Sequence, residues 1–313
     1  MSSTPPLADL RFALVGPGRV GWSLTRWAQD RGARLVAVVG RNKEHARDGA
    51  SLPLDGLWCP LSELSSSRGR LEDADLLLIA VADGAITEVA SHLANALAAP
   101  TAAAPRIALH TSGIHDAEGL APLRDAGFAV GSLHPLMAFP RPLDTPTPRP
   151  PLCAVDGDDT ALELAHRLAE AFGGRGFAIA GDARLLYHLA ATVAAGGVAT
   201  LLAVVERLLE RSGLPAELLP AYFDLARGAL EHAAATRPVT DAITGPAARG
   251  DHATVARQLA ALEAVAPELH AVIAGVHGET TRLRRETGAE APDEALDSLA
   301  ERSTSVDRPG GAC

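Results

Sequence analysis

The chain has 313 residues, of which 47% are hydrophobic, and a formal net charge of −10. This length and composition allow a large core and predict about two domains. The acidic balance excludes a nucleic-acid-binding surface, which needs clustered Lys and Arg. Three widely spaced cysteines indicate neither a disulfide framework nor a zinc site, and the N-terminus lacks a signal-peptide pattern. We therefore expect a cytoplasmic protein without a bound metal.

The first part of the chain alternates between apolar runs and helical patterns. Residues 1–9 form a short polar N-terminal tail, and residues 10–181 follow as one domain. Continuous apolar runs are typical of strands buried on both faces. The pattern predicts an α/β fold, a Rossmann domain with a doubly wound, mostly parallel sheet. The expected strands are 10–15, 35–39, 57–59, 75–81, 106–110, 128–133, 152–155 and 177–180, and the clearest helices are 19–31 and 160–172.

The pattern becomes helical from residue 182 onward. We expect an all-α C-terminal domain over 182–286 and a disordered tail over 287–313. Residues 185–205 carry no charge, and a helix of that length can cross a bilayer. Their many Ala and Gly residues instead favour a helix buried in a core or a subunit interface, without a membrane. The expected helices are 183–211, 215–235, 252–264 and 267–286.

A glycine-rich loop follows the first expected strand and opens the first expected helix. It has the GxGxxG pattern of dinucleotide-binding folds. The first glycine allows a tight turn, the second lets a pyrophosphate approach the backbone, and the third lets the helix pack on the strand. The loop therefore predicts a dinucleotide site formed by Gly16, Pro17, Gly18, Arg19, Val20 and Gly21.

The end of the second expected strand indicates which dinucleotide binds. An acidic residue is typical there of NAD sites, but this chain has Gly40-Arg41-Asn42-Lys43. Arg41 can bind a 2′-phosphate with its planar guanidinium, and Lys43 adds a second positive charge. We predict NADP rather than NAD, the alternative being that both side chains are solvated at the start of a helix. Ala82 and Asp83, after the fourth strand, are further expected cofactor contacts, although Asp83 can also be a helix cap.

Histidines follow two neighbouring strands and begin the long helix. His110 and Ser112 end the fifth strand, His134 ends the sixth, and Tyr187-His188 lies early in the helix. A hydride added to a carbonyl carbon requires a proton for its oxygen, which an imidazole can supply near neutral pH. We therefore treat the three histidines as candidate catalysts, and Ser112 and Tyr187 as candidate substrate ligands. The alternative is that each imidazole holds a loop.

A loop in the helical part offers further substrate ligands. Thr244 and Arg249 lie within small residues, where Arg249 can bind a carboxylate in bidentate fashion. The alternatives are a helix cap for Thr244 and a surface salt bridge for Arg249, with Asp251 capping the next helix.

Several strings together resemble the bacterial proteins that join a Rossmann-like domain to domain-of-unknown-function family 2520. The resemblance spans residues 10 to about 285. It implies a branch of the superfamily of pyrroline-carboxylate reductases, ketopantoate reductases and β-hydroxyacid dehydrogenases, whose helical domain often forms a dimer. The matching strings are the glycine loop, His110-Thr111-Ser112-Gly113, Ser132-Leu133-His134-Pro135-Leu136 with Phe139, Tyr187-His188-Leu189-Ala190-Ala191, and Thr244-Gly245-Pro246 with Arg249-Gly250-Asp251.

These observations lead to one functional hypothesis and one alternative. We expect an NADP-dependent oxidoreductase that reduces a small carboxylated carbonyl or imine compound, with homodimers forming through the helical domain. The sequence departs from the resemblance at Gly196-Gly197, where an asparagine is usual. A noncatalytic NADP-binding sensor or regulatory protein is therefore the alternative.

Overall fold

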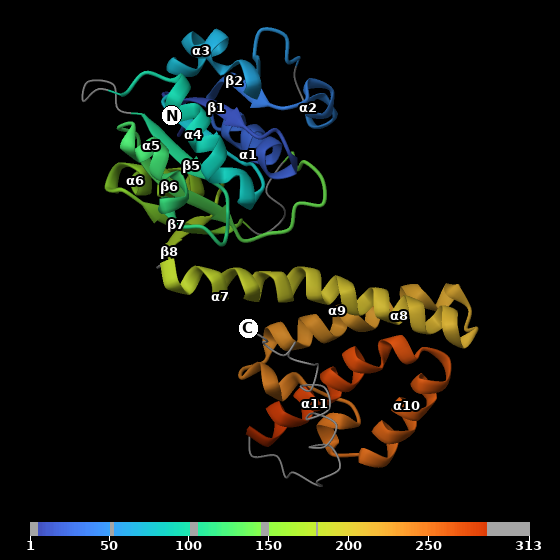
Figure 1. Cartoon of the computed structure of the whole chain (residues 1–313). Coiled ribbons are helices and arrows are strands. Elements are labelled where there is room, and N and C mark those ends of the chain that lie inside the picture. Colours follow the sequence, from blue (N-terminus) through green and yellow to red (C-terminus); the bar gives the residue numbers. More distant parts are fainter. Residues whose placement is uncertain (1–5, 51–52, 101–105, 145–149, 180, 287–313) are drawn as a thin grey trace, which may run out of the picture. The chain divides into compact units, whose positions relative to one another are not determined.

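The structure is a computed structural model that describes residues 6–50, 53–100, 106–144, 150–179 and 181–286. The chain divides into two compact units, Met1–Ala195 and Gly196–Cys313. Figure 1 shows an α/β first unit and a helical second unit. The predicted C-terminal tail, 287–313, lies outside the described residues.

An eight-stranded sheet forms the centre of the first unit, in the order β3-β2-β1-β4-β5-β6-β7-β8. The strands pair in parallel except for β6 and β7, which are antiparallel. The first six strands have the Rossmann order, so the predicted fold class is confirmed. Their bounds are β1 (Arg11–Val15), β2 (Arg34–Gly40), β3 (Trp58–Pro60), β4 (Leu76–Ile79), β5 (Ile107–His110), β6 (Ala129–Pro135), β7 (Leu152–Gly157) and β8 (Arg175–Ala178).

Helices cover both faces of this sheet. On one face α1 (Arg19–Asp30) and α6 (Asp159–Ala171) bury an apolar cluster that includes Trp22 and Trp27. On the other face a second cluster joins the sheet to three helices, because their apolar side chains recur at helical spacing. These are α3 (Arg68–Glu72), α4 (Ile86–Ala96) and α5 (Ala121–Asp125). The sheet is thereby buried on both sides, as its continuous apolar strands require.

The second unit is helical, as predicted. Its helices are α8 (Val198–Ser212), α9 (Leu219–Ala235), α10 (His252–Val265) and α11 (His270–Glu286). Its described core is small and lies mainly on α10 and the segment that leads into α11, where Val255, Leu259, Leu262 and Leu269 are buried. By contrast, α9 has no buried residue.

The long helix differs from its prediction in two ways. Its first half, α7 (Gly181–Thr192), lies in the first unit, and a π-helical stretch, Val193–Gly197, separates it from α8. Gly196 and Gly197 lie in this stretch, where the poor helix propensity of glycine weakens regular α-helical bonding.

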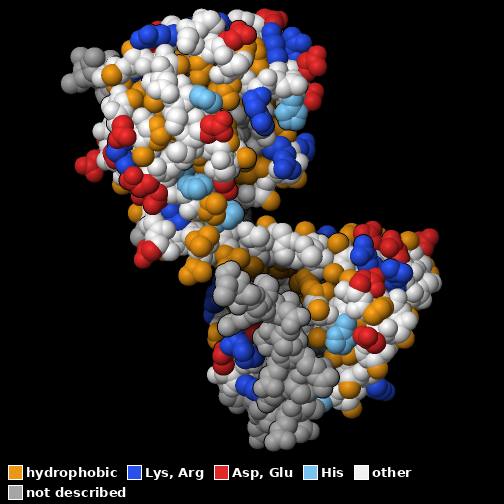
Figure 2. Space-filling view, viewed as in Figure 1, with side chains coloured by type: hydrophobic (Ala, Val, Ile, Leu, Met, Phe, Trp, Pro, Cys, Tyr) orange, Lys and Arg blue, Asp and Glu red, His pale blue; other side chains and the backbone are white. Residues whose placement is uncertain are grey.

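The same helix is not buried within the chain. The span Gly181–Ser212 has 32 residues and a mean hydropathy of 1.9 in its most apolar window, which suffices by length and composition to cross a membrane, and none of that window is buried. The expectation of a core helix is therefore wrong for the single chain, because few residues of α7 and α8 pack against other elements. Figure 2 shows hydrophobic side chains on the surfaces of both units. A subunit interface remains the predicted alternative.

The packed part of the first unit begins before residue 10, where the sequence placed the end of the N-terminal tail. Leu7 is fully buried in the core that contains α1, and its N–H donates to the carbonyl of Arg31 at 2.9 Å. Burial of this one apolar side chain holds the backbone around Leu7 against the core, although composition alone assigns these residues to a tail.

Candidate functional site

The glycine loop forms a cradle between β1 and α1. Gly16 has φ +92°, and a Cβ there would lie 2.6 Å from the carbonyl oxygen of Ala80. A Cβ on Gly21 would lie 2.5 Å from the carbonyl oxygen of Gly16, whereas one on Gly18 would meet no atom within 4 Å. The first and third glycines are thus required by packing, and the second faces open space. Gly18 also precedes α1 without a side-chain cap, which leaves first-turn amides for an anion.

A cavity of about 790 Å³ opens beside this cradle, and its size is typical of a ligand pocket. The ends of β1, β2 and β4 form it, so it lies at the carboxyl edge of the sheet, where open α/β folds bind ligands. Gly16, Pro17, Gly18, Arg41 and Ala82 line it, as do Val15, Val39, Gly40, Asn42, His45, Leu61, Ala80, Val81, Gly84, Ala85, Glu88 and Val89. These residues fit a dinucleotide.

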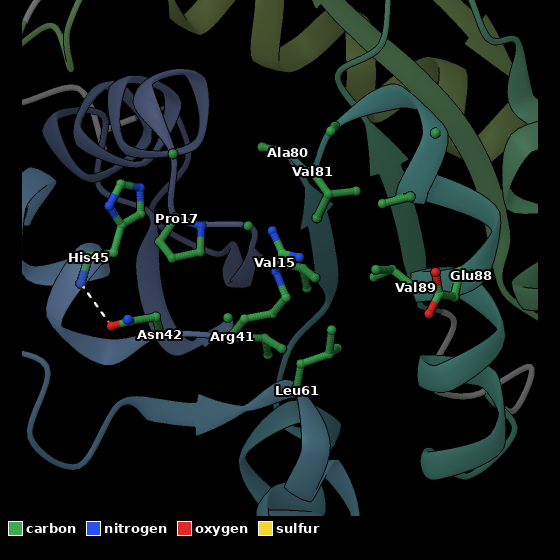
Figure 3. Close-up of a pocket in the computed structure, with 17 residues that line it drawn as sticks. Val15, Pro17, Arg41, Asn42, His45, Leu61, Ala80, Val81, Glu88 and Val89 are labelled. Carbon is green, nitrogen blue, oxygen red and sulfur yellow. Dashed lines mark hydrogen bonds between the residues drawn. The ribbon is translucent and has the colours of Figure 1, made fainter.

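Arg41 and Lys43 differ in their relation to this pocket. Figure 3 shows the Arg41 side chain extending into the cavity, with His45 on the side of Pro17 and Glu88 opposite. Lys43 does not line the cavity, and its Nζ lies 3.0 Å from a carboxylate oxygen of Asp55. The expectation of two cations facing the cofactor is corrected to Arg41 alone, with His45 also lining the cavity.

A short helix explains this arrangement, and the sequence offered it only as the alternative in which Arg41 and Lys43 are solvated at its start. In α2 (Lys43–Gly49), Asn42 is the N-cap, and its Oδ1 accepts from the N–H groups of Glu44 and His45 at 2.8 and 3.1 Å. His45 thereby lines the pocket. An asparagine followed by charged helix formers was the available signal.

Three other predicted cofactor contacts have different surroundings. The Arg19 guanidinium donates to the carbonyl of Pro140 at 3.4 Å, and Val20 packs against the core that contains α1. Ala82, not Asp83, holds the N-cap position of the turn Asp83–Ala85, and among the described residues Ala82 and Gly84 line the cavity but Asp83 does not.

His110 and Ser112 hold the loop after β5. His110 Nε2 lies 2.8 Å from the carbonyl oxygen of Asp116, and the N–H of Ser112 lies 3.2 Å from Nδ1. A carbonyl accepts and an amide donates, so this imidazole is neutral with its proton on Nε2. Burial lowers the pKa of His110 to about 4. Ser112 Oγ accepts from the N–H groups of two following residues, so both side chains serve the loop.

His134, Tyr187 and His188 come together at the end of β6. The Nδ1 of His134 lies 2.8 Å from Tyr187 Oη, and the rings of His134 and His188 are 5.8 Å apart. Gly113 lies against both imidazoles, since a Cβ there would be 2.5 Å from His188 Cδ2 and 2.9 Å from His134 Nε2. Burial, and next the charge of His188, lower the pKa of His134 to about 4. Burial raises the pKa of Tyr187 to about 12.

The two parts of the site lie on one edge of the sheet. Asp83, between two residues that line the pocket, also acts electrostatically on His134. A third group, Arg184 of α7, is fully buried and donates to the carbonyl of Ser112 at 3.2 Å. A guanidinium stays protonated and is a poor general acid, so Arg184 is not a candidate proton donor. Within the described residues, no three His, Cys, Asp or Glu side chains are placed to hold a metal ion.

Thr244 and Arg249 belong to the second unit and are exposed. Asp251 caps α10 by accepting from the N–H of Thr254 at 3.1 Å, as the structural interpretation of this loop predicted. Thr244 does not cap a helix, because Pro246 occupies the cap position of the turn that follows.

Fold and cradle together define a protein of the dinucleotide-binding Rossmann class. Residues 3–135 match the family model of the Rossmann-like domain, and residues 151–275 match that of a domain of unknown function, DUF2520. The chain therefore belongs to the proteins that join a Rossmann-like domain to a DUF2520 domain, and the resemblance inferred from its motifs is confirmed. No curated protein matches the sequence.

Solved structures share this fold at low sequence identity. A Bacteroides fragilis protein described as an NADP oxidoreductase has a TM-score of 0.68 at 19% identity, over 88% of this chain and 99% of its own. Pyrroline carboxylate reductase from Plasmodium falciparum, with NADP bound, has 0.54 at 13%, over 96% and 98%. Imine reductase from Bacillus cereus has 0.54 at 14%, over 94% and 99%.

Proposed function

We propose that the protein is an NADP-dependent reductase of a small carboxylated carbonyl or imine compound. The observation that carries this proposal is the pocket beside the glycine cradle, with the His134–Tyr187–His188 cluster on the same sheet edge. Solved structures of the same fold include a pyrroline carboxylate reductase with NADP bound and an imine reductase, which supports the reaction class. A nucleotide pocket beside groups that can transfer a proton is what such a reduction requires.

The cradle and Arg41 hold the cofactor in this proposal. The first-turn amides of α1 bind the pyrophosphate, and Arg41 binds the 2′-phosphate through a bidentate pair. When bound, the reduced nicotinamide supplies a hydride to an electrophilic carbon. We expect Arg41→Ala to lower NADPH affinity about tenfold or more and to leave NADH affinity nearly unchanged. Lys43→Ala is the matched control, since its ammonium is bonded to Asp55. An unchanged NADPH to NADH ratio in Arg41→Ala refutes NADP selectivity.

His188 is the proposed proton donor. Of the three histidines, His110 has both ring nitrogens bonded to the loop, and His134 is bonded to Tyr187. His188 is partly exposed and packs against Gly113 and His134. We expect His188→Gln to lower turnover about 10²-fold with unchanged NADPH affinity. Equal loss of cofactor binding contradicts this role.

Arg249 remains the proposed carboxylate ligand, and Arg249→Ala should raise KM more than it lowers kcat.

The noncatalytic sensor remains the second candidate, because Gly196 and Gly197 offer no side chain and Ser112 is engaged by its own loop. Incubation with NADPH and a panel of 2-oxo acids, 3-oxo acids and cyclic imines separates the two. The reductase oxidises NADPH with at least one class of these compounds. Tight NADPH binding without turnover on the whole panel supports the sensor.

We further propose that the protein is a soluble homodimer through the exposed apolar side chains of the long helix. Leu185, Leu186, Leu189 and Val193 are between 54% and 68% exposed, an unusual density for a monomer surface. Sedimentation should give twice the chain mass, and Leu186→Lys should shift it toward the monomer. Monomeric wild-type protein, or protein that partitions with membranes, contradicts this assignment.

A further inference from the structure

Glu88 is an acidic side chain in a cavity that is proposed to hold an anionic cofactor. It is exposed, it belongs to α4 rather than to the glycine cradle, and it is the one acid among the described residues that line the cavity. Its carboxylate forms no hydrogen bond or ion pair with any residue that the structure describes. A carboxylate repels phosphate, so its place in this cavity requires an explanation.

Few side chains of the cavity can form hydrogen bonds. Apart from glycine, proline, alanine, valine and leucine, the described lining residues are Arg41, Asn42, His45 and Glu88. The first three lie together after β2, and the Asn42 Oδ1 is already bonded within α2. Glu88 alone comes from α4, and Figure 3 shows it across the cavity from Arg41 and His45. The cavity therefore has a basic side and, facing it, a single carboxylate.

The space between these two sides is apolar. Leu61 after β3, Val81 after β4 and Val89 on α4 line it, and Val89 is only 5% exposed. Figure 3 shows Leu61 and Val81 between Arg41 and Glu88. A planar base with two apolar faces fits between such side chains, and the few polar groups at the edge of an apolar pocket set its specificity. A phosphate group, which is charged on every side, does not fit there.

The position of the cavity along the sheet edge indicates which half of a dinucleotide it takes. The cavity lies at the ends of β2, β1 and β4, whereas the His134–Tyr187–His188 cluster lies at β6, further along the sheet. In the proposed function the nicotinamide belongs near that cluster, so the adenosine half belongs in the cavity. With the 2′-phosphate on Arg41, the base is the part that extends across the apolar space toward Glu88.

The chemistry of a carboxylate decides which base it accepts. An ionised carboxylate accepts hydrogen bonds and donates none. Adenine carries an amino group at position 6, whose N–H a carboxylate can accept, whereas guanine and hypoxanthine carry an oxygen there. Two acceptors that face each other repel, and the water that each loses is not replaced by a new bond. Glu88 therefore suits a 6-aminopurine and disfavours a 6-oxopurine.

We propose that Glu88 determines the base specificity of the cofactor site: its carboxylate accepts a hydrogen bond from the 6-amino group of adenine and disfavours 6-oxopurine dinucleotides. This role rests on the dinucleotide site of the proposed function, but it requires no turnover. Glu88 also lies in the first turn of α4, where an acid interacts favourably with the helix dipole. The dipole interaction contributes to stability and carries no preference between two bases, so the two roles are measured separately.

Binding of NADPH and of reduced nicotinamide hypoxanthine dinucleotide phosphate to the full chain tests this role. The two ligands differ only in the base, and nicotinamide fluorescence measures both dissociation constants. In the wild type the hypoxanthine analogue should bind about tenfold more weakly, because repulsion replaces a hydrogen bond to a charged group. In Glu88→Gln the ratio of the two constants should fall to about one, since the amide can accept from adenine and donate to hypoxanthine.

Glu44→Gln is the matched control. Glu44 is exposed and lies in the first turn of α2, as Glu88 does in α4, but it is not among the described residues that line the cavity. Loss of its negative charge should strengthen the binding of both ligands alike, because both carry the same phosphates. The ratio of the two dissociation constants should therefore stay at the wild-type value.

Three results overturn the proposal. The first is equal binding of the two ligands by the wild type, which assigns Glu88 to a ribose hydroxyl or to solvent. The second is a Glu88→Gln variant that keeps the wild-type ratio, and the third is the same loss of the ratio in Glu44→Gln.

The same measurements distinguish this role from the proposed function. NADH and its hypoxanthine analogue give the ratio for a protein that prefers NAD, so failure of NADP selectivity does not affect the result. Binding without turnover contradicts the reductase alone. Absence of binding by NADPH, NADH and both analogues overturns the cofactor site and the role of Glu88 with it.

Discussion

Acid should destabilise the first unit through His110. This imidazole is fully buried and neutral, and burial lowers its pKa from 6.5 to about 4. The unfolded chain therefore binds a proton at a higher pH than the folded chain does. The stabilising contribution is complete above about pH 6.5 and is lost as the pH falls toward about 4. Over the whole window the loss is about 3 kcal/mol, at about 1.4 kcal/mol per pH unit.

About 2 kcal/mol of this loss falls between pH 7 and pH 5. Urea unfolding followed by tryptophan fluorescence measures it for the first unit, which contains all three tryptophans. His110→Gln keeps a donor for the Asp116 carbonyl but does not titrate. We expect the variant to be less stable at pH 7 by about 1–3 kcal/mol, because the N–H of Ser112 loses its acceptor, and to lose less stability on acidification. Equal losses in wild type and variant between pH 7 and pH 5 refute the buried neutral imidazole.

Three glycine positions give further predictions. Gly113→Ala places a methyl group 2.5 Å from the nearer of two imidazoles, so turnover should fall about 10²-fold while NADPH affinity is retained; unchanged turnover contradicts the packing. Gly16→Ala strains a residue at φ +92° against the Ala80 carbonyl and should lower unfolding free energy by about 1–3 kcal/mol in urea. Gly18→Ala, which meets no protein atom, should leave that stability unchanged but weaken NADPH binding; identical behaviour of both variants contradicts the distinction.

Apolar periodicity determined most of the elements. The strand expected at 10–15 is Arg11–Val15, and the helix expected at 252–264 is His252–Val265. The strand is a continuous buried run, and the buried residues of α10 recur at helical spacing, so local sequence carries the information in both cases. Helix α2 lacks an apolar stripe, with only Ala46 and Gly49 buried, so the sequence offered it only as an alternative to cofactor binding by Arg41 and Lys43. The antiparallel pairing of β6 with β7 was also not specified, since pairing partners are distant in sequence.

The glycine loop, the position of Arg41 and the strand-end histidines were therefore readable from the sequence, because each depends on the order of residues around the end of one strand. The tertiary structure decided what those side chains do. In the structure His110 bonds to its own loop, His134 bonds to Tyr187, and Lys43 pairs with Asp55. Arg184 is fully buried. Hydrogen-bond partners and burial arise between segments far apart in the chain, and they set the charge of each group.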